Sequence, residues 1–273
     1  DRDGDSISDS AAMDLGGAIR FADDGPSIAA GGTGGELIVD ETNFAVDASA
    51  DLSTLFTASL DHGADGAGTV TYQLGLTAAA TGLVDSLSGE AVTLSIVGGA
   101  IYGRTSAHEV FRISVDGAGV VTFNQSRAVL HTPDSGPDQT IRLTGANLIT
   151  LTATAIDGDS DSAQATVDIT DRFVIHDDAP LAVTDEDNLA RDGEIFADGN
   201  VLTGVGSIDT NTMDGAADSA GSDGGLRVVG IASGATAGTV GTSFAGEYGS
   251  IILLANGSYR YDLDIADPAV VAL

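Results

Sequence analysis

Residues 148–169 read LITLTATAIDGDSDSAQATVDI, and this stretch decides the fold. Apolar and polar residues alternate through LITLTATA at its start and through ATVDI at its end. A period of two residues is typical of a β-strand with one buried face. Between the two runs lies DGDSDS at 157–162, a cluster of turn-forming residues. The stretch therefore predicts two strands joined by a short acidic hairpin turn.

The same alternation recurs along the chain. Residues 69–76 (TVTYQLGL) and 110–115 (VFRISV) each place their large apolar side chains on one face. The best candidate for a short helix is 77–89, but Gly82 and Gly89 bound it, and we expect a loop there. Many short strands separated by Gly-rich turns predict an all-β protein. We expect tandem antiparallel β-sandwich domains of the Ig-like or cadherin-like kind.

The acidic turn belongs to a signature that occurs twice. Residues 1–26 and 155–180 align without a gap at an offset of 154, and ten of the 26 positions are identical. A fixed self-offset indicates tandem modules. We therefore expect the C-terminal end of a preceding repeat at 1–26, a complete β-sandwich repeat domain at 27–178, and a further β module, cut short, at 179–273.

The clearest element of the last module is a hairpin at 247–264, EYGSIILLANGSYRYDLD. Asn256 and Gly257 lie between its two alternating runs. This pair is typical of a type I′ turn, in which both central residues have positive φ. No signal peptide opens the chain, and we expect the sequence to be an excerpt from a longer protein.

The chain is strongly acidic, with a formal net charge of −31 over 273 residues. Asp outnumbers Glu by 34 to seven, and Lys is absent. Nucleic acid and anionic lipid would repel such a chain, and no apolar run approaches the roughly 20 residues of a membrane span. Two carboxylates about 4 Å apart repel by roughly 4 kcal/mol at an effective dielectric near 20. Since Cys is absent, thiolate sites are excluded, and calcium on carboxylate oxygens is the predicted cofactor.

The first candidate calcium cluster is the hairpin turn itself. Its carboxylates alternate at Asp157, Asp159 and Asp161, and the first copy of the signature supplies Asp1, Asp3 and Asp5. Alternate carboxylates in a tight loop can converge on one cation, although the spacing does not match an EF-hand. A solvated hairpin turn without metal remains equally open.

The second candidate cluster is the boundary between modules. Acidic pairs close one module and acidic residues open the next in the same layout twice. These residues are Asp177, Asp178, Asp185, Glu186 and Asp187 at one boundary, and Asp23, Asp24, Asp40 and Glu41 at the other. A Pro follows each Asp-Asp pair and biases the preceding residue toward extended backbone. Carboxylates of two modules would then share a cation and stiffen the joint; the alternative is a flexible charged linker.

The third candidate cluster lies in a Gly-, Ala- and Ser-rich loop of the last module. Asp209, Asn211 and Asp214 are followed by Asp218 and Asp223. A disordered acidic loop is an equal alternative.

An enzymatic function is not expected. The four histidines, His62, His108, His131 and His176, are scattered, and none falls in a metal or general-base motif. Nucleophile-elbow, zinc-protease and phosphate-loop motifs are also absent from the sequence.

Several motifs together resemble a known family. The block from LVDSLSGEAVTLSIVGGAIYGRT through VFRISVDGAGVVTFNQSRAVLHT to LITLTATAIDGDSDSAQATVDITD and DDAP is similar to the repeat domains of giant RTX adhesins, which bacteria export by type I secretion. The last module, with NVLTGVGSIDTN and the hairpin, resembles VCBS repeats of the same proteins. The chain departs from the family in lacking the glycine-rich nonapeptide array. Residues 31–39 match the nonapeptide once and loosely, and we expect a loop running into a strand there.

The resemblance implies extracellular, calcium-binding β-sandwich modules in a stalk that takes part in cell adhesion and biofilm formation. We expect a non-catalytic extender segment, secreted or held at the bacterial cell surface, whose partners are the neighbouring domains of one long chain. Other domains would contact surface glycans or proteins. Alternatively one module is itself adhesive, for which Tyr72, Tyr102 and Tyr248 are the candidate aromatic residues, or the acidity only holds water and salt, as in halophiles.

Overall fold

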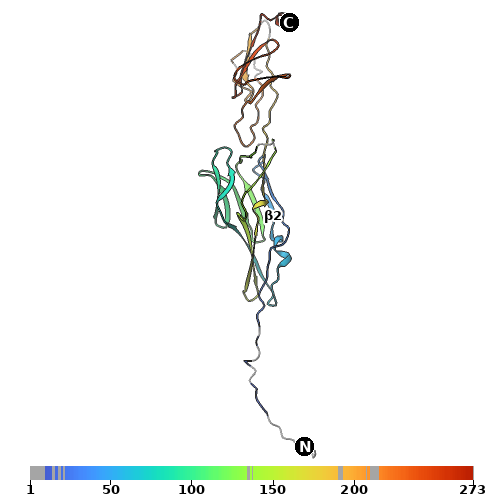
Figure 1. The fold of residues 1–273 in the computed structure, drawn as a ribbon, viewed down its shortest axis with the longest axis vertical. Helices are drawn as coiled ribbons and strands as arrows, with labels where there is room; N and C mark the ends of the chain where they lie inside the picture. Colours follow the sequence, from blue (N-terminus) through green and yellow to red (C-terminus); the bar gives the residue numbers. More distant parts are fainter. Residues whose placement is uncertain are drawn as a thin grey trace, which may run out of the picture.

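The computed structural model describes residues 10–13, 16–17, 20, 22–133, 136, 138–189, 193–206, 208–209 and 215–272. Within these residues the protein is nearly all strand and turn, and its one α-helix, α1, is confined to Pro268–Ala272. The strands form two bodies that lie end to end along the long axis (Figure 1). We call them the central module (27–178) and the last module (179–272). The predicted fold class, all-β with antiparallel sheets, is confirmed.

The central module has two layers. One is a six-stranded antiparallel sheet in the order β2-β8-β7-β6-β5-β4. The other consists of two three-stranded sheets, β1-β12-β9 and β11-β10-β3, and it contacts the first layer mainly through β1 and β3. The strands are β1 (Leu37–Asp40), β2 (Ala48–Asp51), β3 (Ala67–Leu76), β4 (Ala80–Val84), β5 (Ala91–Val97), β6 (Ala100–Arg104), β7 (Glu109–Val115), β8 (Val120–Gln125), β9 (Thr140–Arg142), β10 (Ile149–Asp157), β11 (Ser162–Asp168) and β12 (Phe173–His176).

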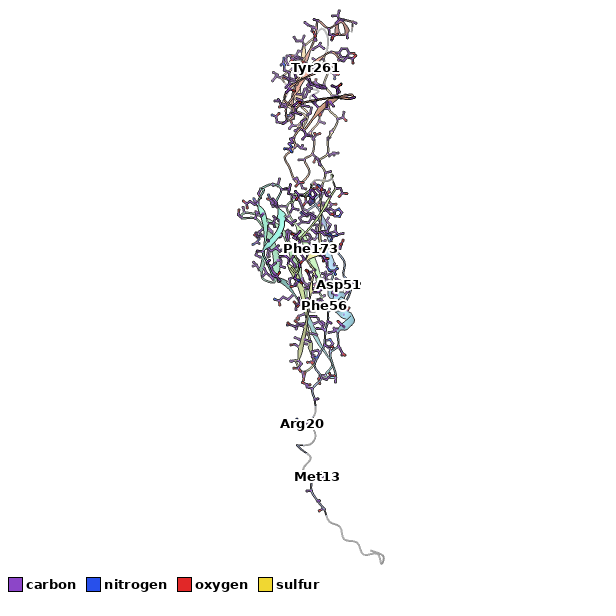
Figure 2. The ribbon with its side chains drawn as sticks, viewed as in Figure 1. Met13, Arg20, Asp51, Phe56, Phe173 and Tyr261 are labelled. Carbon is purple, nitrogen blue, oxygen red and sulfur yellow. The ribbon has the colours of Figure 1, made fainter. Side chains whose placement is uncertain are left out.

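The core between the two layers is apolar and contains three phenylalanines in contact. Phe111 and Phe123 of the six-stranded sheet meet edge to face with centroids 5.5 Å apart, and Phe173 of β12 meets Phe123 edge to face at 5.3 Å. Figure 2 shows Phe173 in the middle of the central module. Gly103 makes room for the Phe111 ring, because a Cβ there would lie 2.4 Å from it. These rings join the layers, so the module has one continuous core.

One strand pair is parallel, and it determines which residues meet at the end of the module. β1 pairs with β12 from Leu37 opposite Phe173 to Asp40 opposite His176. Parallel strands present their carboxyl ends at the same edge of a sheet. The chain therefore emerges from both strands side by side, next to the last module.

The hairpin predicted for residues 148–169 is present. β10 pairs with β11 in antiparallel register from Thr150 opposite Asp168 to Ile156 opposite Ser162, and β3 lies on the other side of β10. The chain continues from β11 through a 3-10 turn at Thr170–Arg172 into β12. The acidic turn at 157–161 therefore lies at the opposite end of the module from the carboxyl end of β12 (Figure 1).

The expectation for residues 77–89 is wrong in part, because β4 forms there at Ala80–Val84. This edge strand pairs with β5 at only two positions, Ala80 with Thr93 and Val84 with Ala91, with a register shift between them. Gly82 has φ +78° inside this irregular stretch. A glycine-centred bulge thus lets an edge strand form where the glycine suggested a loop.

The last module consists of a four-stranded sheet, β13-β18-β17-β16, and a small β14-β15 hairpin. Its strands are β13 (Phe196–Asn200), β14 (Ile231–Ser233), β15 (Thr236–Gly238), β16 (Ser243–Ala245), β17 (Gly249–Leu253) and β18 (Ser258–Leu263). Tyr261 of β18 lies within this module (Figure 2). The described apolar residues of the last module are far less buried than those of the central module. Every residue of the main hydrophobic core belongs to the central module.

The predicted hairpin at 247–264 is present as β17 and β18, but its turn differs from the predicted type I′. Gly257 has φ +85°, whereas Asn256 does not have positive φ. The Leu254 N–H donates to the Ser258 carbonyl at 2.8 Å, and the Gly257 N–H donates to Leu254 at 3.0 Å. The connection is therefore a three-residue loop with glycine in the left-handed position, which is the other common hairpin geometry.

Candidate metal centres

Acidic side chains from both modules converge where the modules meet. Carboxylate oxygens of Glu41, Asp177, Asp178 and Asp223 all lie within 4.8 Å of one another, and so do ligand atoms of Glu41, His131 and Asp177. We call these five residues the junction centre. Four come from the central module and Asp223 comes from the last module.

The parallel strand pair positions the first two carboxylates. Glu41 directly follows β1, and its N–H donates to the His176 carbonyl at 3.0 Å. Asp177 directly follows β12, and its N–H donates to the Gln139 carbonyl at 2.8 Å. The backbone therefore fixes Glu41 and Asp177 as neighbours, although they lie 136 positions apart in the sequence.

The loop around Ser222 brings the last module to this centre. The Ser222 N–H donates to Asp178 Oδ2 at 2.7 Å, and its hydroxyl donates to the Glu41 carbonyl at 2.5 Å. Gly221 has φ +68°, and a Cβ there would lie 2.6 Å from Asp178 Oδ2. Only glycine fits this close approach, which places Asp223 against the carboxylates of the central module.

Glu41 is fully buried, and its two oxygens have different surroundings. Oε1 accepts hydrogen bonds from Gln125 Nε2 at 2.7 Å and from the Val129 N–H at 2.9 Å. Oε2 accepts none from the residues that the structure describes. Burial raises the pKa of Glu41 from 4.5 to about 8, and Asp223 and Asp177 add to the rise through their negative charge. Burial also raises the pKa of Asp177.

The other carboxylates of the junction centre also have a buried oxygen without a hydrogen-bond donor. One buried oxygen each of Asp177, Asp178 and Asp223 finds no hydrogen-bond donor in the described part of the chain. A buried polar atom without a partner costs about 1–3 kcal/mol, and more when it carries charge. One oxygen of each of these carboxylates lies within 4.8 Å of one oxygen of every other, so a single divalent cation would offset their mutual repulsion.

His131 also reaches the junction centre, and only 6% of it is exposed. Its Nδ1 lies 3.4 Å from Asp177 Oδ2, and its Nε2 lies 4.0 Å from Glu41 Oε1. Neither ring nitrogen makes a hydrogen bond with any described residue. The centre therefore offers nitrogen as well as oxygen ligands.

A second group of acidic residues lies at the other end of the central module, at the β10–β11 turn. Asp157, Asp159 and Asp161 have carboxylate oxygens within 4.8 Å of one another, and Asp159 is equally close to Asp23 and Asp65. We call these five residues the hairpin centre. Asp23 precedes the central module, so this centre joins the segment before the module to the module itself.

Asp157 is the buried member of the hairpin centre, with 4% of it exposed. Its Oδ1 accepts a hydrogen bond from the Asp161 N–H at 2.8 Å, whereas Oδ2 is buried and has no donor among the described residues. Contact with Asp157 raises the pKa of Asp159, and the charge of Asp23 raises the pKa of Asp161. For Asp159 the main cause is a hydrogen bond with the Asp157 carboxylate, and for Asp161 it is the like charge of Asp23; a cation would relieve the charge repulsion in both.

The structure pairs the predicted boundary residues differently from the expected layout. Glu41 lies with Asp177 and Asp178 rather than with Asp23 and Asp24. The reason is that β1 runs the chain toward the last module before Glu41, while Asp23 stays beside the β10–β11 turn. Each acidic Asp-Asp pair therefore faces the module that follows it in the chain.

Most of the remaining predicted residues make hydrogen bonds away from the two centres. Asp24 accepts a hydrogen bond from the Ala64 N–H at 3.2 Å. Asp40 accepts one from the Thr42 N–H at 2.8 Å, and Asp185 accepts one from the Ala216 N–H at 2.8 Å. Asp187 accepts from the Tyr259 hydroxyl at 2.5 Å, Asp209 accepts from Asp198 N–H at 3.0 Å, and Glu186 is exposed. The predicted ligands Asp1, Asp3, Asp5, Asn211 and Asp214 lie outside the described residues.

Sequence reasoning missed His131 and Asp65, and it placed Asp223 in a separate loop cluster. No spacing motif links His131 to Glu41, because they meet only through the pairing of distant strands. Asp65 lies in a Gly-rich turn just before β3, which pairs with β10. Had the strand predicted at 69–76 been paired with the one at 148–155, Asp65 could have been predicted to lie at the hairpin centre.

The three tyrosines proposed as aromatic contacts lie in separate places. Tyr72 packs beside Phe56 in the central module, and the Arg104 guanidinium lies 4.2 Å from the Tyr102 ring centre. Tyr248 lines a hollow of about 410 Å³ in the last module together with Tyr259 and Tyr261.

Comparison with known proteins adds one finding. No curated protein matches the chain. A family model described as a domain of unknown function, DUF5801, matches residues 36–170. This range includes Glu41, His131 and most of the hairpin centre, and it ends before Asp177. The central module thus carries a DUF5801 domain.

Proposed function

We propose that this chain is a non-catalytic, calcium-binding extender segment of a secreted or cell-surface bacterial adhesin. The observation that carries the proposal is the junction centre. Four carboxylates from two modules lie close enough to share a hard cation that binds six to eight oxygens, and each has one buried oxygen without a donor among the described residues. The sequence resemblance to repeats of RTX adhesins supports the surface location, the adhesive context and type I secretion.

Calcium would act on the joint rather than on a substrate. Without a cation, Asp177 and Asp178 repel Asp223, and this repulsion pushes the modules apart. With calcium bound, the same residues would link the carboxyl ends of β1 and β12 to the loop around Ser222. The partners of each module are then its neighbours in the chain, and the array behaves as a stiff rod. None of the described helices is long and apolar enough to cross a membrane.

Calcium removal is expected to lower the melting temperature of the protein. Extracellular calcium sites have dissociation constants on the order of 10⁻⁴ to 10⁻³ M. At ten times its dissociation constant, one site adds about 1.4 kcal/mol to the free energy of unfolding. Two centres would add about 3 kcal/mol, or about 6–12 °C for a protein of this size. Calorimetric melts in excess calcium and in EDTA measure the difference.

Sodium chloride at matched ionic strength is the control for charge screening. If salt alone restores the calcium value, the acidity serves only to hold water and salt, as in halophiles. An unchanged melting temperature in EDTA contradicts the proposal.

A second candidate function is ligand binding by the last module. The hollow lined by Tyr248, Tyr259 and Tyr261 favours it, because aromatic faces and a nearby Asp187 carboxylate suit a sugar ring. A glycan array probed with the whole chain in calcium tests this function. Binding that Tyr261→Ala abolishes would assign an adhesive role to this module, and an array without signal would leave the extender function alone.

A further inference from the structure

His131 makes the junction centre different from an all-oxygen calcium site. We propose that Glu41, His131 and Asp177 bind a transition metal ion of the zinc class in addition to the calcium assigned to the carboxylates. The proposal deepens the proposed function by naming a second metal at the same joint. It depends on the ring nitrogens of one buried histidine and on two carboxylates that face them.

The burial of His131 is the first step of the argument. A buried imidazole normally donates or accepts at one nitrogen at least. His131 does neither within the described residues, although it is 6% exposed and surrounded by polar groups. Both unpartnered nitrogens lie next to carboxylates whose own oxygens are unpartnered. Metal ligation would satisfy one nitrogen of His131, with the Asp177 carboxylate beside it.

Distances are the second step. Zinc binds imidazole nitrogen and carboxylate oxygen at about 2.0–2.2 Å in a tetrahedral arrangement, which separates two ligand atoms by roughly 3.4 Å. His131 Nδ1 and Asp177 Oδ2 are 3.4 Å apart, which is also longer than a good N–H···O hydrogen bond. One ligand atom each of Glu41, His131 and Asp177 lies within 4.8 Å of the others, so Glu41 belongs to the same set.

Ligand chemistry is the third step. Calcium and magnesium take oxygen ligands, whereas imidazole suits zinc, copper, nickel and iron. Glu41 and Asp177 belong to both groups of ligands. His131 completes one group, and Asp178 and Asp223 complete the other. A carboxylate has two oxygens and can bridge two ions. The transition metal would therefore bind beside calcium and stay on the central module, since its three ligands all precede the last module.

The test uses the whole chain, freed of metal and then saturated with calcium, with zinc titrated calorimetrically. We expect one zinc ion per chain, and binding at least about a hundredfold weaker in His131→Asn. His108→Asn, which alters an exposed histidine, is the matched control and should bind zinc as the wild type does. Asp157→Asn should lose calcium at the hairpin centre without losing zinc.

Cobalt provides a readout that does not depend on the variant folding. In the Co²⁺-loaded wild type, one imidazole N–H proton should appear in the ¹H NMR spectrum far outside the diamagnetic range. Absence of that signal, or zinc binding unchanged in His131→Asn, overturns the proposal and identifies His131 as a charge partner of Asp177. If calcium has no effect while zinc still binds, the proposed extender function fails and this inference stands.

Discussion

Replacing Glu41 with Gln is expected to stabilise the metal-free protein and to remove most of the calcium response of the junction centre. Glu41 is fully buried, and burial raises its pKa to about 8. Ionising it in the folded state therefore costs on the order of 4–5 kcal/mol more than in the unfolded chain. Glutamine keeps an acceptor for Gln125 and Val129 and carries no charge. We expect a gain of about 1–3 kcal/mol in EDTA.

The pH dependence of this gain has a defined sign. A carboxyl whose folded pKa lies above its unfolded value contributes stability below the unfolded pKa, and that stability is lost as pH rises through the folded value. For Glu41 the window runs from 4.5 to about 8. In EDTA, the advantage of Glu41→Gln should therefore be small near pH 4 and should grow until about pH 8.

Chemical denaturation of both proteins, with EDTA and with calcium, measures these effects. Glu36→Gln is the matched control, because Glu36 just precedes β1 and its side chain is 48% exposed beside Arg142. An exposed ion pair is worth about 0–1 kcal/mol, so this variant should behave as the wild type in both conditions. A Glu41→Gln protein that is less stable in EDTA, and that keeps the full calcium response, would show Glu41 to be a structural hydrogen-bond acceptor only.

Local patterns in the sequence predicted the strands with the clearest alternation. Alternation at 69–76, 110–115 and 148–169 corresponds to β3, β7 and the β10–β11 hairpin, because side-chain alternation is a property of the strand itself. The three acidic residues at 157–161 lie together because one tight turn contains all of them. Whether they bind calcium remains a prediction.

The membership of the junction centre could not be read from local patterns. Glu41 meets Asp177 only because β1 and β12 pair in parallel, and parallel strands need not be close in sequence. His131 enters from a loop after β8, and Asp223 enters through the glycine at 221, whose φ permits a close contact with Asp178. The repeated Asp-Asp-x-Pro signature indicated where the joint lies, but not which residues of each module face it.

Replacing Asp223 with Asn is expected to uncouple the two modules without unfolding either of them. Asp223 is the only member of the junction centre from the last module among the described residues, and its buried Oδ1 lacks a donor. Losing this ligand leaves Glu41, Asp177 and Asp178 to bind calcium more weakly on the central module alone. Of the hydrogen bonds between the modules that the described residues make, the joint then keeps the two from Ser222, which water can replace.

The chain has no Cys, so Ser95→Cys and Ser243→Cys place one spin label on each module without interference. Both serines are exposed, on β5 and β16. In calcium, the distance distribution between the labels should be narrow in the wild type and should broaden in EDTA, whereas Asp223→Asn should be broad in both. Asp262→Asn, which alters an exposed carboxylate paired with Arg260, should keep the narrow distribution. A narrow distribution for Asp223→Asn in calcium would mean that backbone packing holds the joint, and the cation would then have no mechanical role there.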